Sequence, residues 1–487
     1  MKRFVVNTVK GIVKALLSGT IGAFIVLVTV FVLRLESRQE LKVWHTAELD
    51  EEFTAENPVK SFEGYLALED RLFAQLGERV LDRVRPEDRR RINRFHRGSL
   101  SDPGQWPRNW NRTFELSTDA PEAGVLLLHG MSDSPYSLRS IGQHLHDSGT
   151  WVVGLRLPGH GTAPSGLVDV RYEDMAAAVR LAVRHLRDKV NDRPLYIVGY
   201  SNGAALAIQY VLLALEDTTL PQVNKLVLIS PSIGVTKIAA LAVWQARLGH
   251  FLGLDKLAWQ DIQPEYDPFK YSSFAVNAGD QVYRLTNEIR SSFKKPGTSE
   301  KLSRFPPVLA FQSVVDATVS TRAVVQILFK QLPEGGHELV LFDINRVAEI
   351  ETVLTDDPKE DIEAVISDTG LSFVFSLITN AGSNSRDIVL RQKKPSQSGI
   401  TEISLGMKWP RGIYSLSHVA LPFSVKDSLY GRSDSADGSK LQLGNMDFRG
   451  ERGALQIPAS AMLRLRWNPF YPYIEQRLLE FLKSETD

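Results

Sequence analysis

The sequence predicts an α/β fold in which a mainly parallel sheet carries helices on both faces. From Asn111 onward, short apolar runs alternate with longer segments of helical periodicity, which is the pattern of parallel strands joined by helical crossovers. The run at 125–128 is wholly apolar, as a strand buried on both faces should be. With 487 residues, the chain can form one large domain with insertions, or two domains.

The elements of this fold follow in order along the chain. We expect strands at 113–116, 125–128, 151–155, 195–198, 225–229, 307–311 and 338–342. We expect helices at 137–147, 172–189 and 204–215, and a closing helix through 471–482. The domain predicted by this alternation spans 111–487.

Two insertions interrupt the alternation, and an extension precedes it. Residues 232–303 are apolar with helical periodicity, which predicts a cap over a site. Residues 345–412 are polar and mixed, with strand-like runs at 373–377 and 388–390. In the extension, 35–110, apolar residues between Phe62 and Leu81 recur at helical spacing and predict an amphipathic helix packed on the body.

The N-terminus predicts a membrane anchor. Lys2, Arg3, Lys10 and Lys14 precede 15–33, a stretch of nineteen uncharged and mostly apolar residues. A helix needs about 20 such residues to cross a bilayer, and no A-x-A-like cleavage site follows, which favours an anchor over a signal peptide. The basic residues before the span place the N-terminus in the cytoplasm. We therefore expect 1–34 to hold the protein in a bacterial inner membrane, with one span and the rest of the chain in the periplasm.

The composition excludes several classes of function. The chain has no cysteine, which excludes disulfides, thiolate zinc sites and a cysteine nucleophile. Its formal net charge is zero, so nothing in the overall charge indicates a nucleic-acid partner. We expect neither a cofactor nor a metal, and the sequence leaves the oligomeric state open.

The most informative motif is Gly199-Tyr200-Ser201-Asn202-Gly203, between an apolar strand and a helix. In such a G-x-S-x-G turn the serine is strained and exposed at the carboxyl edge of the sheet, and the glycines avoid clashes with neighbouring backbone. The motif alone occurs by chance, but its position between strand and helix is the context that it requires. Ser201 is therefore our candidate nucleophile.

A serine nucleophile needs a histidine base and a carboxylate that orients the histidine. In the fold indicated by this turn, the order along the chain is serine, acid, histidine. Of the late histidines, His337 lies at the start of a strand, the wrong end for this site, so we choose His418. Asp316 follows the 307–311 strand and is our candidate acid, with Asp343 as the competitor.

Negative charge develops on the substrate's carbonyl oxygen during attack by the serine, and backbone N–H donors are needed to stabilise it. The residue after the nucleophile, Asn202, supplies one of them. The second should come from the loop after the 125–128 strand, His129-Gly130-Met131, and Met131 is our choice. We expect His129 to shape this loop rather than to act as the base.

Taken together, these residues resemble the α/β-hydrolase fold, in its branch of carboxylesterases, monoacylglycerol lipases and related, serine aminopeptidase-like hydrolases. The matching pieces, in family order, are Leu127-Leu-His-Gly-Met131, Leu157-Pro-Gly-His-Gly-Thr162, the Ser201 turn, Asp316 and Ser417-His418. The family usually runs directly from the strand near Asp343 to its histidine, whereas residues 345–412 intervene here. Asn202 also stands where a larger apolar residue is common.

The resemblance implies a serine hydrolase that cleaves carboxylic esters through an acyl-enzyme, with Ser201, Asp316 and His418 as triad and Met131 and Asn202 as oxyanion donors. The apolar cap suggests a lipid-like or other hydrophobic acyl ester drawn from the nearby bilayer. Acyl transfer or peptide cleavage by the same triad stays open. So does a catalytically inactive envelope scaffold of the same fold, whose insertions would serve as binding surfaces.

Overall fold

The computed structural model describes residues 37–234, 255–295, 297–316, 319–348, 358–397, 399–413, 415–432, 441–444 and 465–484, and a few positions between 18 and 30. Most of the predicted anchor at 15–33 lies outside the described residues. So does all of 235–254, which is part of the predicted cap. Within the part of the chain that is described, no helix has both the length and the apolar character needed to cross a membrane.

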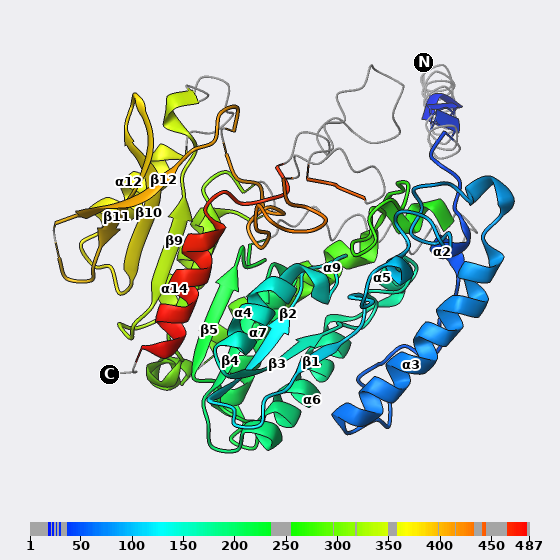
Figure 1. Ribbon diagram of the computed structural model, residues 1–487, viewed down its shortest axis with the longest axis horizontal. Helices are drawn as coiled ribbons and strands as arrows, with labels where there is room; N and C mark the ends of the chain where they lie inside the picture. Colours follow the sequence, from blue (N-terminus) through cyan, green and yellow to red (C-terminus); the bar gives the residue numbers. More distant parts are fainter. Residues whose placement is uncertain are drawn as a thin grey trace, which may run out of the picture.

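The described residues form a ten-stranded sheet in the order β1-β3-β2-β4-β5-β8-β9-β10-β11-β12 (Figure 1). Neighbouring strands from β3 to β10 run parallel, whereas β1, β11 and β12 are antiparallel to their neighbours. The prediction of a mainly parallel sheet is therefore confirmed. The strands are β1 (Phe114–Leu116), β2 (Ala123–Leu128), β3 (Thr150–Leu155), β4 (Leu195–Tyr200), β5 (Lys225–Ile229), β8 (Val308–Ser313), β9 (Glu338–Phe342), β10 (Val374–Gly382), β11 (Ser385–Lys393) and β12 (Thr401–Lys408).

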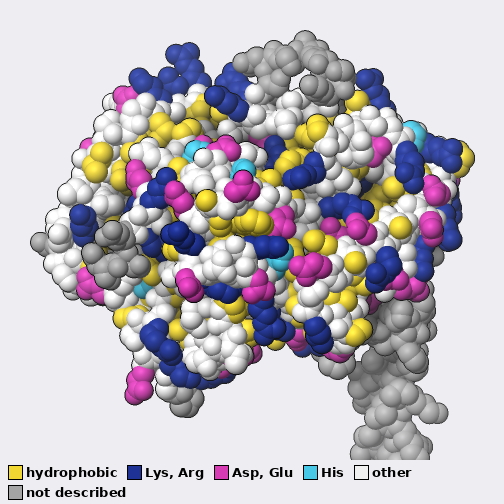
Figure 2. Space-filling view, turned by 60° about the horizontal axis from the view of Figure 1, so that its bottom comes forward, with side chains coloured by type: hydrophobic (Ala, Val, Ile, Leu, Met, Phe, Trp, Pro, Cys, Tyr) yellow, Lys and Arg dark blue, Asp and Glu magenta, His cyan; other side chains and the backbone are white. Residues whose placement is uncertain are grey.

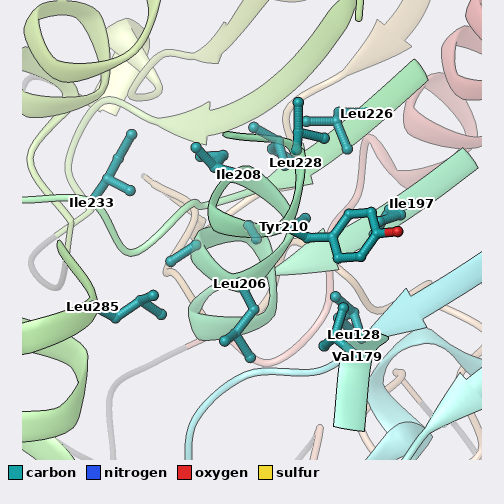
Figure 3. Close-up of a cluster of buried hydrophobic side chains, with 14 of the residues drawn as sticks. Leu128, Val179, Ile197, Leu206, Ile208, Tyr210, Leu226, Leu228, Ile233 and Leu285 are labelled. Carbon is teal, nitrogen blue, oxygen red and sulfur yellow. The ribbon is translucent and has the colours of Figure 1, made fainter. Parts of the chain in front are cut away.

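Helices cover both faces of this sheet, because successive side chains of a strand point to opposite sides. Leu126 and Leu128 of β2 pack with α6, α7 and α9, whereas Val125 and Leu127 pack with α4 and α14. Figure 3 shows the first of these cores around α7, where Leu206, Ile208 and Tyr210 meet side chains of β2, β4 and β5. These helices are α4 (Arg139–Asp147), α6 (Tyr172–Val190), α7 (Asn202–Glu216), α9 (Val276–Lys294) and α14 (Tyr471–Lys483).

The described part of the predicted cap differs from the expectation. Helix α9 lies inside 232–303, but it packs against α6 and α7 in the helix layer and buries Leu285 and Ile289 there. It is therefore part of the sheet's helical layer and not of a cap. The shorter elements around it are α5 (Gly166–Asp169), β6 (Trp259–Asp261), β7 (Phe274–Ala275), α10 (Thr298–Lys301) and α11 (Thr321–Ile327).

The predicted second insertion, 345–412, extends the central sheet. Helix α12 (Lys359–Ser367) leads into β10, which pairs with β9, and β11 and β12 continue to the far edge, drawn in yellow and orange in Figure 1. The sequence did not predict β12. Its side chains are mostly exposed at this edge, including Ile403, so it lacks the apolar pattern of a core strand.

The N-terminal extension is integrated into the same body. After α2 (Val43–Thr46) comes helix α3 (Phe62–Arg79), whose N-cap is Ser61; the Ser61 side chain accepts a hydrogen bond from the Gly64 N–H. Phe62, Tyr65 and Leu68 of α3 are buried in the core that α6 and α7 form with the sheet. The face of the molecule in Figure 2 carries basic and acidic side chains interspersed, in keeping with the zero net charge.

Candidate active site

Ser201 stands in a strained turn between β4 and α7. Its φ of 55° and ψ of −116° lie in a region that side-chain-bearing residues rarely adopt. A Cβ at Gly199 would come 2.5 Å from the Ala204 Cα, and a Cβ at Gly203 would come 2.1 Å from the Leu128 carbonyl oxygen. Both glycines are therefore required for the close approach of backbone segments that holds the serine in this conformation.

The structure brings the three predicted triad residues together. His418 Nε2 lies 3.0 Å from Ser201 Oγ, and His418 Nδ1 lies 2.7 Å from Asp316 Oδ2. The Asp316 side chain is fully buried and that of His418 is 9% exposed. This geometry fits the tautomer in which Nδ1–H donates to the carboxylate and Nε2 accepts the serine proton. A hydrogen-bonded relay from serine to carboxylate is therefore in place.

Loops after distant strands hold the acid and the histidine. Asp316 follows β8, and its Oδ1 accepts a hydrogen bond from the Val319 N–H at 3.0 Å. The Ser313 hydroxyl at the end of β8 donates to the Leu416 carbonyl at 2.8 Å, which ties the acid loop to the histidine segment. The Tyr200 hydroxyl donates to the His418 carbonyl at 3.4 Å. The imidazole position is thus fixed from both the β4 and the β8 side.

The competing residues lie elsewhere. Asp343 is held by the Arg346 guanidinium at 2.7 Å and by the Thr379 hydroxyl at 2.7 Å. His337 is buried at the start of β9, where its Nδ1 accepts from the Val308 N–H, and burial lowers the pKa of its imidazole to about 4. Neither residue is placed to serve Ser201.

The loop after β2 lies directly against the serine. A Cβ at Gly130 would come 3.1 Å from the Ser201 Cβ, so the 129–131 backbone packs on the nucleophile. Among the described residues, neither the Met131 nor the Asn202 backbone N–H has a hydrogen-bond acceptor. As far as the described residues go, both N–H groups are available to donate to a substrate oxygen.

His129 links this loop to the next one. Its Nε2 accepts from the Leu157 N–H at 3.0 Å, and its Nδ1 lies 2.9 Å from the Gly130 carbonyl oxygen. Burial, together with the neighbouring His160, keeps the pKa of His129 well below its ordinary value. A neutral imidazole with both nitrogens engaged shapes the loop and has no free nitrogen with which to act as a base.

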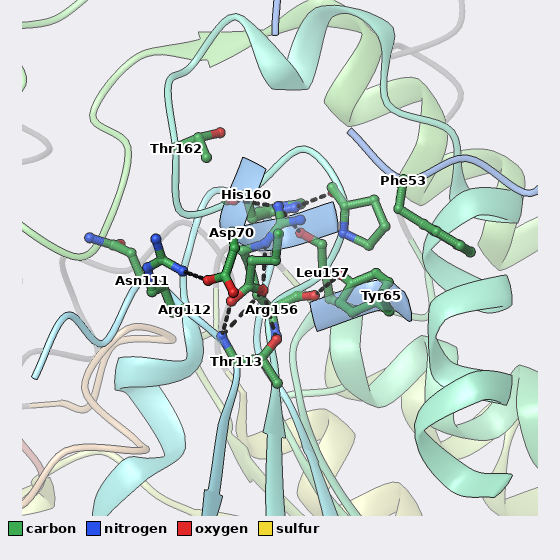
Figure 4. A network of polar contacts seen from close by, with 12 residues as sticks. Phe53, Tyr65, Asp70, Asn111, Arg112, Thr113, Arg156, Leu157, His160 and Thr162 are labelled. Carbon is green, nitrogen blue, oxygen red and sulfur yellow. Dashed lines mark hydrogen bonds and ion pairs between the residues drawn. The ribbon is translucent and has the colours of Figure 1, made fainter. Parts of the chain in front are cut away.

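A buried ion network, which the sequence did not predict, anchors the 156–162 loop to the N-terminal extension (Figure 4). Arg156, with a side chain 1% exposed, binds Glu52 through two nitrogens at 2.9 and 3.0 Å and Glu69 of α3 at 3.0 Å. Glu52 also accepts from the Gly159 N–H at 2.8 Å. Burial opposes the charge on Arg156, but the two glutamates outweigh it and raise its pKa well above the ordinary value.

A second residue that the sequence did not predict is Ser232, whose hydroxyl oxygen lies 3.0 Å from Ser201 Oγ. A serine after an apolar strand is too common to be a signal by itself, and its contact with the nucleophile depends on the tertiary fold. Among the described residues, no cluster of three or more acidic or histidine side chains could hold a metal ion.

Comparisons with known proteins find relatives of the domain that carries the candidate site. Residues 119–342 match the family described as serine aminopeptidase, S33. The match covers less than half of the chain and includes Ser201 and Asp316, but it stops at the end of β9, before the added strands and His418. The thermostable monoacylglycerol lipase of Bacillus sp. (strain H-257) is 25% identical over 218 residues, which cover 45% of this chain and 79% of that protein.

Solved structures that resemble the chain include one from a study of two metagenome-derived lipolytic enzymes, LipS and LipT. That structure has 20% identity, a TM-score of 0.37, and coverage of 48% of this chain and 87% of that one. Another is the monoacylglycerol lipase of Paleococcus ferrophilus, with 20% identity, a TM-score of 0.36, and coverage of 48% and 89%.

Strand order, the serine turn and the matched family define the class of this protein, an α/β-hydrolase. The chain is an enzyme of the serine hydrolase class with this fold. It resembles the branch of carboxylesterases and monoacylglycerol lipases that includes the serine aminopeptidase family.

Proposed function

We propose that the protein hydrolyses carboxylic esters of lipid-like or other hydrophobic acyl groups through an acyl-enzyme on Ser201. The observation that carries this proposal is the chain of contacts from Ser201 Oγ to His418 at 3.0 Å and from His418 to Asp316 at 2.7 Å. The strained turn that presents Ser201 at the carboxyl edge of the sheet supports it further.

The first half-reaction acylates the serine. Ser201 Oγ attacks the ester carbon while His418 Nε2 takes its proton, and Asp316 holds the imidazole and stabilises its positive charge. The Met131 and Asn202 N–H groups donate to the oxyanion of the tetrahedral intermediate. His418 then gives the proton to the departing alcohol, and the acyl group stays on Ser201.

The second half-reaction returns the free enzyme. Water attacks the acyl carbon, His418 takes a proton from it, and the same two N–H groups stabilise the second tetrahedral intermediate. The intermediate collapses with expulsion of Ser201 Oγ, which regains its proton from His418. The products are a carboxylic acid and the alcohol released earlier, so atoms and protons balance.

The preference for a lipid-like substrate rests on two supports. One is the similarity to a protein named as a monoacylglycerol lipase. The other is the sequence of 15–33, which we propose as a single uncleaved span that anchors the enzyme in a bacterial inner membrane with its catalytic domain in the periplasm. A reporter fused after Asp487 should then be active only outside the cytoplasm, and activity confined to the cytoplasm would contradict this orientation.

The enzymatic proposal is tested with p-nitrophenyl esters of increasing acyl length. Purified full-length protein in mild detergent should hydrolyse them, and Ser201→Ala should abolish hydrolysis while the thermal unfolding midpoint stays near that of the wild type. An anilide of the same acyl group, assayed in parallel, separates esterase from peptidase activity. If the folded wild-type protein cleaves none of these substrates, the proposal is refuted.

A further inference from the structure

The turn after β5 contains a second strained serine. Ser230 follows the last residue of β5, is fully buried, and has a φ of 47°, in the left-handed region that non-glycine residues seldom occupy. Its N–H donates to the Phe311 carbonyl at 2.8 Å, which fixes the turn against β8. Backbone strain of this kind persists only where the surrounding structure enforces it, and it is concentrated at functional sites.

The strained turn directs Ser232 onto the nucleophile. Ser232 Oγ lies 3.0 Å from Ser201 Oγ, and the Ser232 N–H donates to the Ser201 carbonyl at 3.1 Å. The Thr286 hydroxyl of α9 donates to the Ser232 carbonyl at 3.1 Å, and Ser232 is 3% exposed. Contacts to its N–H and its carbonyl therefore hold the Ser232 backbone in place, with its hydroxyl beside the reacting oxygen.

The direction of the Ser201–Ser232 hydrogen bond follows from the position of His418. The Ser201 proton points to His418 Nε2, so Ser201 Oγ can act only as an acceptor toward Ser232. The Ser232 hydroxyl is the donor. This contact is separate from the oxyanion donors, because those N–H groups act on the substrate's carbonyl oxygen and Ser232 acts on the nucleophile's own oxygen.

We propose that Ser232 is a further catalytic residue, whose hydroxyl stabilises negative charge on Ser201 Oγ. Charge builds on Oγ as His418 removes the proton during attack, and again as Oγ is expelled from the acyl carbon in the second half-reaction. A hydrogen bond to a charged acceptor is stronger than one to a neutral acceptor. The Ser232 proton stays on Ser232 throughout, and no bond to Ser232 forms or breaks. The role rests on the proposed function of Ser201.

The test is the second-order rate constant for labelling of full-length protein by a fluorophosphonate probe. Ser232→Ala should slow labelling by about tenfold, as expected for one hydrogen bond to a charged group. Ser232→Thr keeps a hydroxyl and should recover most of the rate. The matched control is Ser230→Ala, which removes a buried hydroxyl from the same turn that has no hydrogen-bond partner among the described residues. It should label at the wild-type rate.

The labelling rates of these variants decide whether Ser232 acts as a hydrogen-bond donor to Ser201 Oγ. If Ser232→Ala labels as fast as Ser230→Ala, or if Ser232→Thr is as slow as Ser232→Ala, Ser232 is not a catalytic donor. Absence of labelling in folded wild-type protein overturns the proposed function, and the role of Ser232 with it. Should Ser232→Ala fail to fold, Ser232→Cys replaces the hydroxyl with a weaker donor, and a wild-type labelling rate in that variant would overturn the role.

Discussion

The network around Arg156 provides a sharp test of how the N-terminal extension is joined to the hydrolase domain. Replacing Arg156 with methionine keeps an apolar stem but removes the positive charge. Glu69, whose side chain is only 3% exposed, would then be a buried carboxylate without its cation. Removing one partner of a buried ion pair costs about 3–5 kcal/mol, because the remaining charge is uncompensated. That is a large share of a typical stability of about 5–15 kcal/mol.

The matched control is an exposed ion pair of similar geometry. Arg71 lies 2.9 Å from Glu51, but its side chain is 55% exposed, and such pairs contribute about 0–1 kcal/mol. Equilibrium urea unfolding of the full-length protein, followed by tryptophan fluorescence, should show a much lower midpoint for Arg156→Met than for Arg71→Met. Adding Glu69→Gln to Arg156→Met should recover part of the loss. Equal midpoints for the two single variants, or a double variant no more stable than Arg156→Met, would refute the reasoning.

Three further predictions concern the site and its surroundings. Asp316→Asn should lower kcat by about 10,000-fold because His418 loses its orienting carboxylate, whereas Asp343→Asn should leave kcat nearly unchanged; the reverse pattern in ester hydrolysis would identify Asp343 as the acid. Asn202→Ala should leave kcat/KM nearly unchanged, because only its N–H is used and its side-chain oxygen has no partner among the described residues; a large loss would show that the side chain takes part. Burial raises the pKa of Asp133 from 3.8 to about 6, so the folded protein holds this proton more tightly than the unfolded chain, and stability is lost as pH rises through that range. Above pH 6, the free energy of unfolding of Asp133→Asn should therefore exceed that of the wild type by up to about 3 kcal/mol. A difference between the two free energies of unfolding that does not change with pH would contradict this.

Local patterns in the sequence predicted the core of the fold and the serine turn. Buried parallel strands such as β2, which is apolar along its whole length, and β5, which is apolar from Leu226 to Ile229, can be recognised without knowledge of their neighbours. The Ser201 turn is equally local, because its two glycines and the flanking strand and helix all lie within one stretch of chain. The order of serine, acid and histidine then reduced the choice of partners to a few residues.

Apart from the triad, which the order of serine, acid and histidine brought together, contacts between distant residues were not predicted. Arg156 finds Glu52 and Glu69 at separations of 104 and 87 residues, and Ser232 meets Ser201 across 31. No spacing rule connects such pairs. The role of residues 345–412 also depended on context, because strands such as β12 at the edge of a sheet carry exposed polar side chains and resemble a loop in sequence.

The most direct test of the central claim is to locate the modified residue after reaction with a fluorophosphonate. Peptide mass spectrometry of labelled full-length protein should find the adduct on Ser201, and the Ser201→Ala variant should carry none. An adduct on another serine, or undiminished labelling of Ser201→Ala, would contradict the assignment of Ser201 as the nucleophile.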